Sequence, residues 1–197
     1  MPIKLQVVNT VVYGCRMTSR LTAHDWLKQG LKTLAQSGPE GLKAELLAKS
    51  LGVSRGSFYW HFKDINAFKM ALLERWKAII TDNTIADLAA HTERQDRLAE
   101  IMRRAFSFDD CLEQAVRRWS FQSKAVRRAV AAVDHVRIDY LKALLVDAGL
   151  SESAASARSV FIYSASLGRS QIGNDPTARL TDSDISTIAR LLKTNLD

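Results

Sequence analysis

The feature that most constrains this chain is the stretch from Gly52 to Phe62, which reads GVSRGSFYWHF. A leucine-rich helical segment, Glu45 to Leu51, runs into Gly52, and Ser54 then offers a hydroxyl to the free N–H groups of a second short helix. Two short helices joined by a turn that contains glycine form the helix-turn-helix pattern, whose second helix can enter a DNA major groove. The alternative interpretation is an ordinary helical hairpin within an all-α core.

Positive charge is concentrated in the same part of the chain. Residues 1–80 carry 12 Lys and Arg against 5 Asp and Glu, whereas residues 81–197 carry 16 of each. A basic module joined to a neutral one favours a polyanionic partner for the first module alone. The alternative is a basic surface that is merely solvated.

Several classes of protein are disfavoured by composition and motifs. With 47% apolar residues among 197 the chain can bury a core, and its few Pro and Gly argue against a disordered or all-β chain. The four His are scattered, and the motifs of metalloproteases, phosphate-binding glycine loops and enzymatic nucleophiles are lacking, so we expect no enzyme, metal or cofactor. Cys15 and Cys111 match no metal or redox spacing, which suits a reducing compartment such as the cytoplasm. No apolar run reaches the roughly 18 residues typical of a membrane helix.

Apolar residues recur at helical spacing throughout the first part of the chain. The helices predicted there span about 22–36, 43–50, 54–61 and 65–82. Thr22 and Asp64 are expected to cap the first and fourth helices, and Phe58 and Phe62 to face inward from the third. The fourth helix carries an apolar stripe that is expected to run unbroken to Asp82, and its length predicts a connector.

The second part is predicted to be helical over about 94–106, 110–119, 123–148, 151–171 and from 181 onward. Ser123 opens the third of these helices, and Thr181 with Asp184 forms a capping box for the last. Arg137 interrupts an apolar stripe, and Asp134, three residues earlier, is its expected partner.

The pairs Gly41-Leu42 and Leu47-Ala48, the run Leu51-Gly52-Val53-Ser54 and the aromatic run that ends at Phe62 carry a family resemblance. Residues 26–68 resemble the DNA-binding head of the tetracycline-repressor (TetR/AcrR) family of bacterial transcription regulators. The resemblance implies an all-α fold of about nine helices, in which a three-helix head is joined by a connector helix to a ligand-binding and dimerising body. The implied domains are a helix-turn-helix domain at 21–64 and the connector and body at 65–197. Residues 1–20 form an arm that need not be native, because Met17 is an alternative start.

The resemblance implies DNA contacts by Lys43, Ser54, Arg55, Gly56, Ser57, Tyr59, Trp60, His61 and Lys63. Arg55 and Ser57 would meet base edges, and Gly56 would allow close approach. Tyr59, His61 and Lys63 would hold phosphates, as would Lys43 at the start of the second helix, whereas Trp60 has either a backbone contact or a packing role. Two positions depart from the family pattern: Ile65 replaces a frequent Lys, and Glu45 is acidic and is expected to point away from DNA.

The body is implied to bind an effector and a second subunit. Candidate effector-pocket residues are Met102, Phe106, Trp119, Phe121, His135 and Tyr140, with a plain core as the alternative. The last two helices are the candidate dimer surface, through Ala154, Ala157, Phe161, Ser164, Gly168, Ile172, Ile185, Ile188 and Leu192, unless these stripes only close the monomer core.

The expected function is that of a sequence-specific DNA-binding transcriptional regulator. A homodimeric repressor that reads a palindromic operator and responds to a small molecule fits the resemblance best. The alternatives are an architectural or cell-division factor on the same scaffold without an effector, and a helical protein–protein adaptor.

Overall fold

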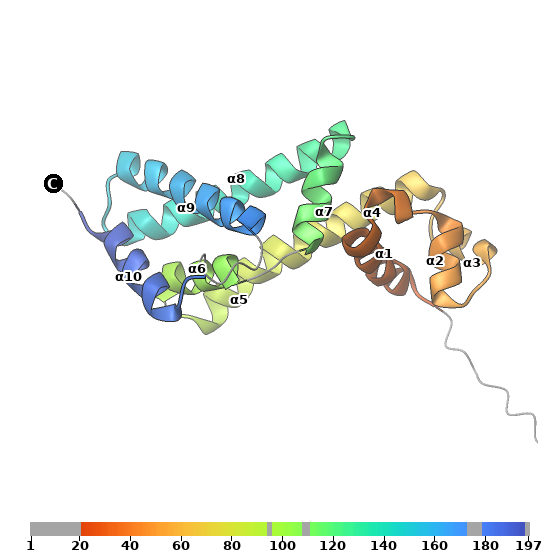
Figure 1. Ribbon diagram of the computed structural model, residues 1–197, viewed down its shortest axis with the longest axis horizontal. Coiled ribbons are helices and arrows are strands. Elements are labelled where there is room, and N and C mark those ends of the chain that lie inside the picture. Colours follow the sequence, from red (N-terminus) through yellow and green to blue (C-terminus); the bar gives the residue numbers. More distant parts are fainter. Residues whose placement is uncertain (1–20, 94–95, 108–110, 173–178, 196–197) are drawn as a thin grey trace, which may run out of the picture.

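The computed structural model describes residues 21–93, 96–107, 111–172 and 179–195, and these are helical without any strand. The predicted arm at 1–20 lies outside them. Figure 1 shows an elongated molecule with a small head at one end and a larger body at the other. The head and connector comprise α1 (Ala23–Ser37), a 3-10 turn η1 (Pro39–Gly41), α2 (Ala44–Leu51), α3 (Arg55–Tyr59) and α4 (Ile65–Lys77).

The body comprises a π-helical segment η2 (Ala78–Asp82), α5 (Asn83–His91), α6 (Arg97–Ser107), α7 (Cys111–Ser120), α8 (Lys124–Asp147), α9 (Glu152–Ile172) and α10 (Asp182–Lys193). Since α4, η2 and α5 follow one another with helical backbone at both junctions, the described part of the chain holds nine separate helices. The expected all-α fold of about nine helices is therefore confirmed.

The helix starts follow the predicted capping chemistry. Thr22 and Asp25 form a capping box on α1, and Thr181 and Asp184 form another on α10. The Asp64 carboxylate accepts a hydrogen bond of 2.8 Å from the Ala67 N–H at the start of α4. Such caps satisfy the backbone donors that a helix leaves unpaired at its first turn.

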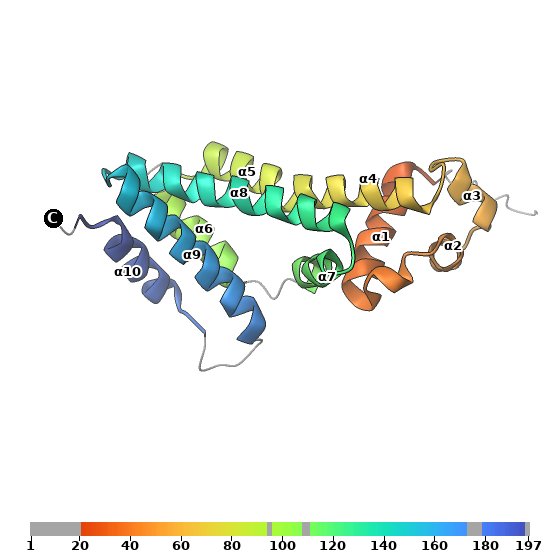
Figure 2. The ribbon, with the colours of Figure 1, turned by 90° about the horizontal axis from the view of Figure 1, so that it is seen from above.

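Two apolar clusters hold the chain together. The first, the head cluster or head core, joins α1–α4 to α7 and the beginning of α8, so that α7 packs directly on the head. The second, the body cluster or body core, lies among α6, the end of α8, α9 and α10. Figure 2 shows α8 running lengthwise beside the continuous helix of α4, η2 and α5. Since α8 contributes side chains to both clusters, it links them.

Gly30 allows α1 to approach α4 closely. A Cβ at this position would lie 2.5 Å from Phe68 Cζ and 2.9 Å from Leu72 Cδ1, both in the head core. We expect Gly30→Ala to lower the free energy of unfolding by about 1–3 kcal/mol, the usual cost of overpacking a core, as measured by urea denaturation. In the control Gly56→Ala the new Cβ meets only the Ser54 Oγ, at 3.8 Å, and we expect no loss. Equal losses in the two variants would contradict this account of Gly30.

The predicted unbroken stripe of the connector ends at Lys77. There the α-helix gives way to η2, and a π-helical turn takes one more residue than an α-helical turn. The faces of the helix shift accordingly, and the polar Thr81 becomes buried while Ile79 and Ile80 are half-buried. Apolar periodicity could not indicate this shift, because Ile79 and Ile80 fit a regular stripe equally well.

Candidate nucleic-acid interface and ligand cavity

The corner between α2 and α3 is set by Gly52. Its backbone lies in the left-handed region, with φ 70° and ψ 28°, where glycine avoids the steric cost paid by other residues. Its N–H donates to the Lys49 carbonyl, and the Val53 N–H donates to the Ala48 carbonyl. The chain therefore leaves α2 and enters α3 in a helix-turn-helix geometry.

An aromatic cluster fixes α3 against the head core. The Phe58 ring is fully buried, and its centroid lies 5.3 Å from those of Trp26 and Phe62 and 5.4 Å from that of Phe68. The prediction that Phe58 and Phe62 face inward is confirmed. Because a five-residue helix has little stability of its own, these contacts hold its opposite face toward solvent.

The predicted DNA contacts are placed on the outside of the head. Lys43, Ser54, Arg55, Gly56, Tyr59, Trp60 and Lys63 are exposed, and Ser57 and His61 are half-buried. The Arg55 guanidinium donates a hydrogen bond of 3.3 Å to the Tyr59 hydroxyl, and its central carbon lies 5.7 Å from the Tyr59 ring centroid. This bond is the main reason that the pKa of Arg55 is raised. The second helix of the motif thus exposes a permanently charged guanidinium group that can donate two parallel hydrogen bonds.

The capping role expected of the Ser54 hydroxyl is wrong. Ser54 is the N-cap residue of α3, but its side chain makes no capping hydrogen bond, and its carbonyl accepts the Ser57 N–H at 3.0 Å. The hydroxyl remains exposed.

The start of α2 opens onto a groove that suits an anion. Lys43 is the N-cap residue and supplies no side-chain acceptor, so the first N–H groups of α2 have no side-chain cap. The groove, of about 390 Å³, is lined by Leu42, Lys43, Ala44, Glu45, Arg55, Tyr59, Ile65 and Lys69. Lys69 was missed by sequence reasoning, because it belongs to the connector and joins this groove only through the fold.

Glu45 does not point away from this face as expected. It lines the groove with Lys43 and Arg55 and adds to the rise in the pKa of Arg55. A carboxylate here repels phosphate, so we expect Glu45→Gln to raise DNA affinity about two- to fivefold at low salt, since one exposed charge contributes up to about 1 kcal/mol. Fluorescence anisotropy with labelled duplex DNA measures this effect. Glu40→Gln, on the neighbouring turn η1, is the matched control, and an equal gain there would contradict a local role for Glu45.

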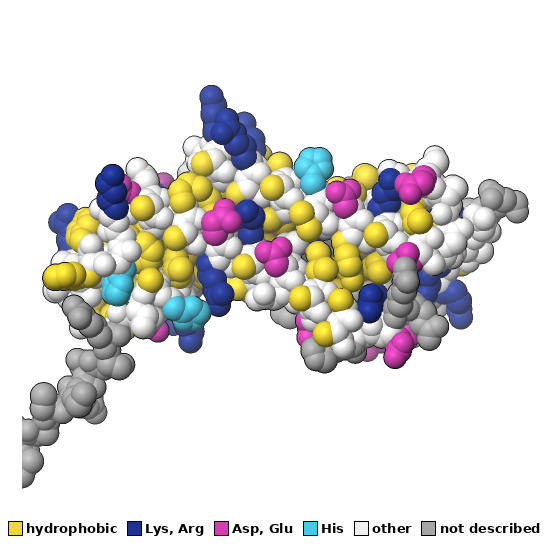
Figure 3. All heavy atoms as spheres, turned by 180° about the vertical axis from the view of Figure 1, so that it is seen from behind, with side chains coloured by type: hydrophobic (Ala, Val, Ile, Leu, Met, Phe, Trp, Pro, Cys, Tyr) yellow, Lys and Arg dark blue, Asp and Glu magenta, His cyan; other side chains and the backbone are white. Residues whose placement is uncertain are grey.

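The body carries equal numbers of positive and negative side chains, yet part of its surface is strongly positive. Residues 114–133 contain no Asp or Glu, and Arg118, Lys124, Arg127 and Arg128 are exposed where α7 turns into α8. Figure 3 shows a group of dark-blue Lys and Arg side chains on a tip that projects from one side of the molecule.

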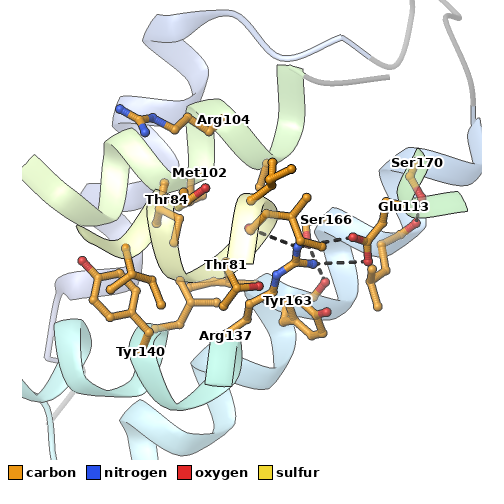
Figure 4. Close-up of a pocket in the computed structure, with 18 of the residues that line it drawn as sticks. Thr81, Thr84, Met102, Arg104, Glu113, Arg137, Tyr140, Tyr163, Ser166 and Ser170 are labelled. Carbon is orange, nitrogen blue, oxygen red and sulfur yellow. Dashed lines mark hydrogen bonds and ion pairs between the residues drawn. The ribbon is translucent and has the colours of Figure 1, made fainter. Parts of the chain in front are cut away.

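A cavity of about 660 Å³ lies in the body, between η2 and α5 on one side and α6, α7, α8 and α9 on the others. Of the six predicted effector-pocket residues, Met102 and Tyr140 line it (Figure 4). The other four lie elsewhere. Trp119 belongs to the head cluster, Phe121 is exposed at the α7–α8 turn, His135 is exposed on α8, and Phe106 is a half-buried side chain packed on the body cluster.

A charged network forms one wall of the cavity. The buried Glu113 carboxylate accepts hydrogen bonds from Arg117 at 2.8 Å and from both terminal nitrogens of Arg137 at 3.3 Å. Arg117 also donates to Asp134 at 2.7 Å, so the expected pairing of Asp134 with Arg137 is wrong. Burial alone would lower the pKa of Arg117, but its bond to Asp134 and the charge of Glu113 outweigh that and raise it.

Tyr163 completes this network from α9. Its hydroxyl donates to Asp134 at 2.6 Å and accepts from Arg117 at 2.8 Å. Burial raises the pKa of Tyr163 to about 12. Sequence reasoning missed the network because, apart from the i,i+4 pair of Glu113 and Arg117, its bonds join residues 17 to 46 positions apart along the chain.

The predicted dimer residues fall into two groups. Ala157, Phe161, Ser164, Gly168 and Ile172 form an exposed stripe along α9. Ile185 is buried in the body core of its own subunit, and Ala154, Ile188 and Leu192 pack against that core. The inward stripe of α10 therefore closes the monomer.

Together, the head geometry defines a helix-turn-helix protein whose second helix presents an arginine and a tyrosine outward. Residues 27–69 match the model of bacterial regulatory proteins of the tetR family. This match identifies the head as a DNA-binding domain of the tetR type and supports a function as a DNA-binding transcriptional regulator. A comparison with curated proteins finds no match.

Solved structures share the whole fold at low sequence identity. The reduced form of NemR from E. coli is 21% identical with a TM-score of 0.65, covering 87% of this chain and 95% of that one. The superantigen PfiT is 19% identical with a TM-score of 0.67, covering 91% and 100%. A protein described as a TetR-family transcriptional regulator from Rhodococcus sp. is 21% identical with a TM-score of 0.62, covering 87% and 98%.

Within the described residues, no helix is long and apolar enough to cross a membrane, and no three His, Cys, Asp or Glu side chains are grouped as metal ligands.

Proposed function

We propose that this protein is a homodimeric transcriptional repressor that binds a palindromic operator and releases it when a small molecule fills the body cavity. It acts in the cytoplasm. The observation that carries the proposal is the outward face of α3, where Arg55 and Tyr59 stand exposed on a helix anchored by the buried Phe58. In a major groove, an arginine so placed can make two hydrogen bonds to guanine O6 and N7.

Around α3 the phosphate contacts would fix the register of the head. The groove at the start of α2 offers uncapped N–H groups together with Lys43 and Lys69. A helix N-terminus and a nearby cation both stabilise a phosphate. His61 and Lys63 follow α3 directly in the chain, and we assign them to the neighbouring phosphates. The positive tip at the α7–α8 turn adds long-range attraction for DNA.

A palindromic operator requires two heads about 34–36 Å apart, hence a symmetric dimer. We assign the dimer surface to the exposed stripe of α9, where Phe161 is 65% and Ile172 57% exposed. Gly168 has open space around it, so a partner helix can approach closely there. Val136 on the adjacent α8 is also exposed, so α8 takes the place that sequence reasoning gave to α10.

Phe161→Glu is expected to convert the dimer into a monomer at micromolar concentration, because it buries a charge in an apolar interface. Sedimentation velocity measures the change. Phe121→Glu, at a more exposed aromatic in the α7–α8 turn, is the matched control and should leave the dimer intact. A Phe161→Glu protein that remains dimeric would contradict this surface.

Ligand response follows from the position of the cavity. Its wall includes η2, which continues directly into α4, and α4 packs in the head core. A molecule that prefers one arrangement of this connector lowers DNA affinity by its difference in affinity for the two arrangements. A cavity of about 660 Å³ is within the range of small-molecule sites, which favours this mechanism over an architectural factor without effector.

The experiment that tests the function is selection of binding sites from a pool of random DNA duplexes by the purified protein. We expect an enriched inverted repeat whose half-site centres lie about one helical turn, or a multiple of it, apart. Recovery of sequences without a shared motif would contradict the proposal.

A further inference from the structure

The cavity contains a buried hydroxyl without a partner. Thr81 is only 3% exposed, and its Oγ1 has no hydrogen-bond partner. In a regular α-helix a threonine hydroxyl can donate to the carbonyl one turn earlier, but in η2 it does not. An unpaired buried hydroxyl costs folding free energy, so a site that retains one is suited to a ligand that supplies the missing acceptor.

A second hydroxyl in the cavity is also buried without a hydrogen-bond partner. Tyr140, from α8, has a buried hydroxyl oxygen with no partner. Burial raises the pKa of Tyr140, so this hydroxyl keeps its proton and remains a donor. Figure 4 shows Thr81 and Tyr140 on two different walls of the cavity.

Each charged side chain of the lining is already paired with an opposite charge. Arg137 is bound to Glu113 and to the Ile80 carbonyl, each at 3.3 Å. Arg104 is bound to Glu100 at 2.9 Å and to Asp87 at 2.7 Å. An anionic ligand would meet arginines whose charge carboxylates already offset, and a cationic ligand would find Glu113 already held by two arginines.

We propose that the cavity binds an uncharged, mainly apolar molecule whose carbonyl, ester or ether oxygen accepts a hydrogen bond from Thr81. Most of the lining is apolar, through side chains such as Ile79, Ile101, Leu112 and Ile162. The Tyr140 hydroxyl is a second donor for a ligand that carries another oxygen. This inference rests on the proposed function for its biological meaning, because the cavity is the same one.

The Thr81 contact also explains how binding of such a ligand in the body affects the head. Thr81 lies in η2, and the Arg137 side chain holds the neighbouring Ile80 carbonyl, so this turn is tied to the body network. A ligand oxygen bonded to Thr81 stabilises the π-helical form of the connector relative to a regular helix. Because a π-helical turn takes one more residue than an α-helical turn, a change from one form to the other would rotate α4 and the head relative to the body.

The test uses the fluorescent reporter N-phenyl-1-naphthylamine and its displacement by three molecules of equal chain length: decan-2-one, decanoate and decylammonium. We expect the ketone to bind at least tenfold more tightly than either ion. Thr81→Val, which keeps the side-chain shape, should weaken the ketone about 3- to 10-fold, the equivalent of one hydrogen bond, and leave reporter binding unchanged. Thr81→Ser should restore ketone binding.

Ser166→Ala is the matched control, because Ser166 lines the same cavity but its hydroxyl already donates to the Tyr163 carbonyl at 2.7 Å. Decanoate or decylammonium binding as tightly as the ketone, equal ketone affinity in Thr81→Val, or no displacement by any of the three would overturn the inference. Release of operator DNA, measured in parallel with each ligand, distinguishes a failure of this inference from a failure of the proposed function. Release by decanoate alone would leave ligand response standing, whereas ketone binding without release would remove ligand response and keep the ligand class.

Discussion

Arg55→Ala is expected to lower affinity for the selected operator at least tenfold while changing affinity for random-sequence DNA by less than about threefold. The side chain is exposed at the first position of α3, and its bidentate contact with guanine is expected to contribute about 1–3 kcal/mol in each half-site. Random DNA is held mainly through its phosphates. The lysines of the head still contact these phosphates in the Arg55→Ala variant. Titrations of both duplexes at one fixed salt concentration measure the two effects.

The matched control for Arg55→Ala is Arg190→Ala. Arg190 is an exposed arginine on α10, at the end of the body away from the head (Figure 1), so its loss removes the same charge without a groove contact. We expect operator affinity to change by less than twofold. If Arg55→Ala weakened operator and random DNA equally, Arg55 would be a phosphate contact rather than a base contact.

Glu113→Gln is expected to lower the free energy of unfolding by about 3 kcal/mol. Glu113 is buried and is bound to both Arg117 and Arg137, so its loss leaves two largely enclosed guanidinium groups with one carboxylate, Asp134. Breaking one partner of a buried ion pair typically costs about 3–5 kcal/mol, and the partial exposure of both arginines places this case at the lower end. Urea denaturation followed by circular dichroism measures the loss.

Glu74→Gln is the control for that substitution. Glu74 pairs with Lys77 at 2.9 Å in an exposed i,i+3 bridge, for which about 0–1 kcal/mol is typical. A Glu113→Gln protein no less stable than Glu74→Gln would show that the network does not hold α7, α8 and the connector together.

Local chemistry made much of the fold predictable from sequence. The caps at Thr22, Asp64, Ser123 and Thr181 depend on a hydrogen bond to a residue three positions later, and the structure contains each of them. The inward faces of Phe58 and Phe62 follow from their four-residue spacing. These contacts lie within one or two helical turns, which a single sequence can specify.

Contacts between distant segments were not predictable in the same way. Periodicity could not indicate that Ile185 packs into its own subunit while Phe161 stays outside, because both stripes are apolar. Asp134 was close in sequence to Arg137, yet Arg117 on a neighbouring helix reaches it instead. The cavity lining likewise depends on how η2 turns Thr81 inward, which follows from a shift in helix register rather than from residue type.

The most direct test of the account is protection of guanine N7 from methylation by dimethyl sulfate on the selected operator, since N7 lies in the major groove. We predict one protected guanine in each half-site, lost in Arg55→Ala and retained in Arg190→Ala. Unprotected N7 atoms throughout a bound operator, or protection that persists in Arg55→Ala, would contradict the docking of α3 in the major groove.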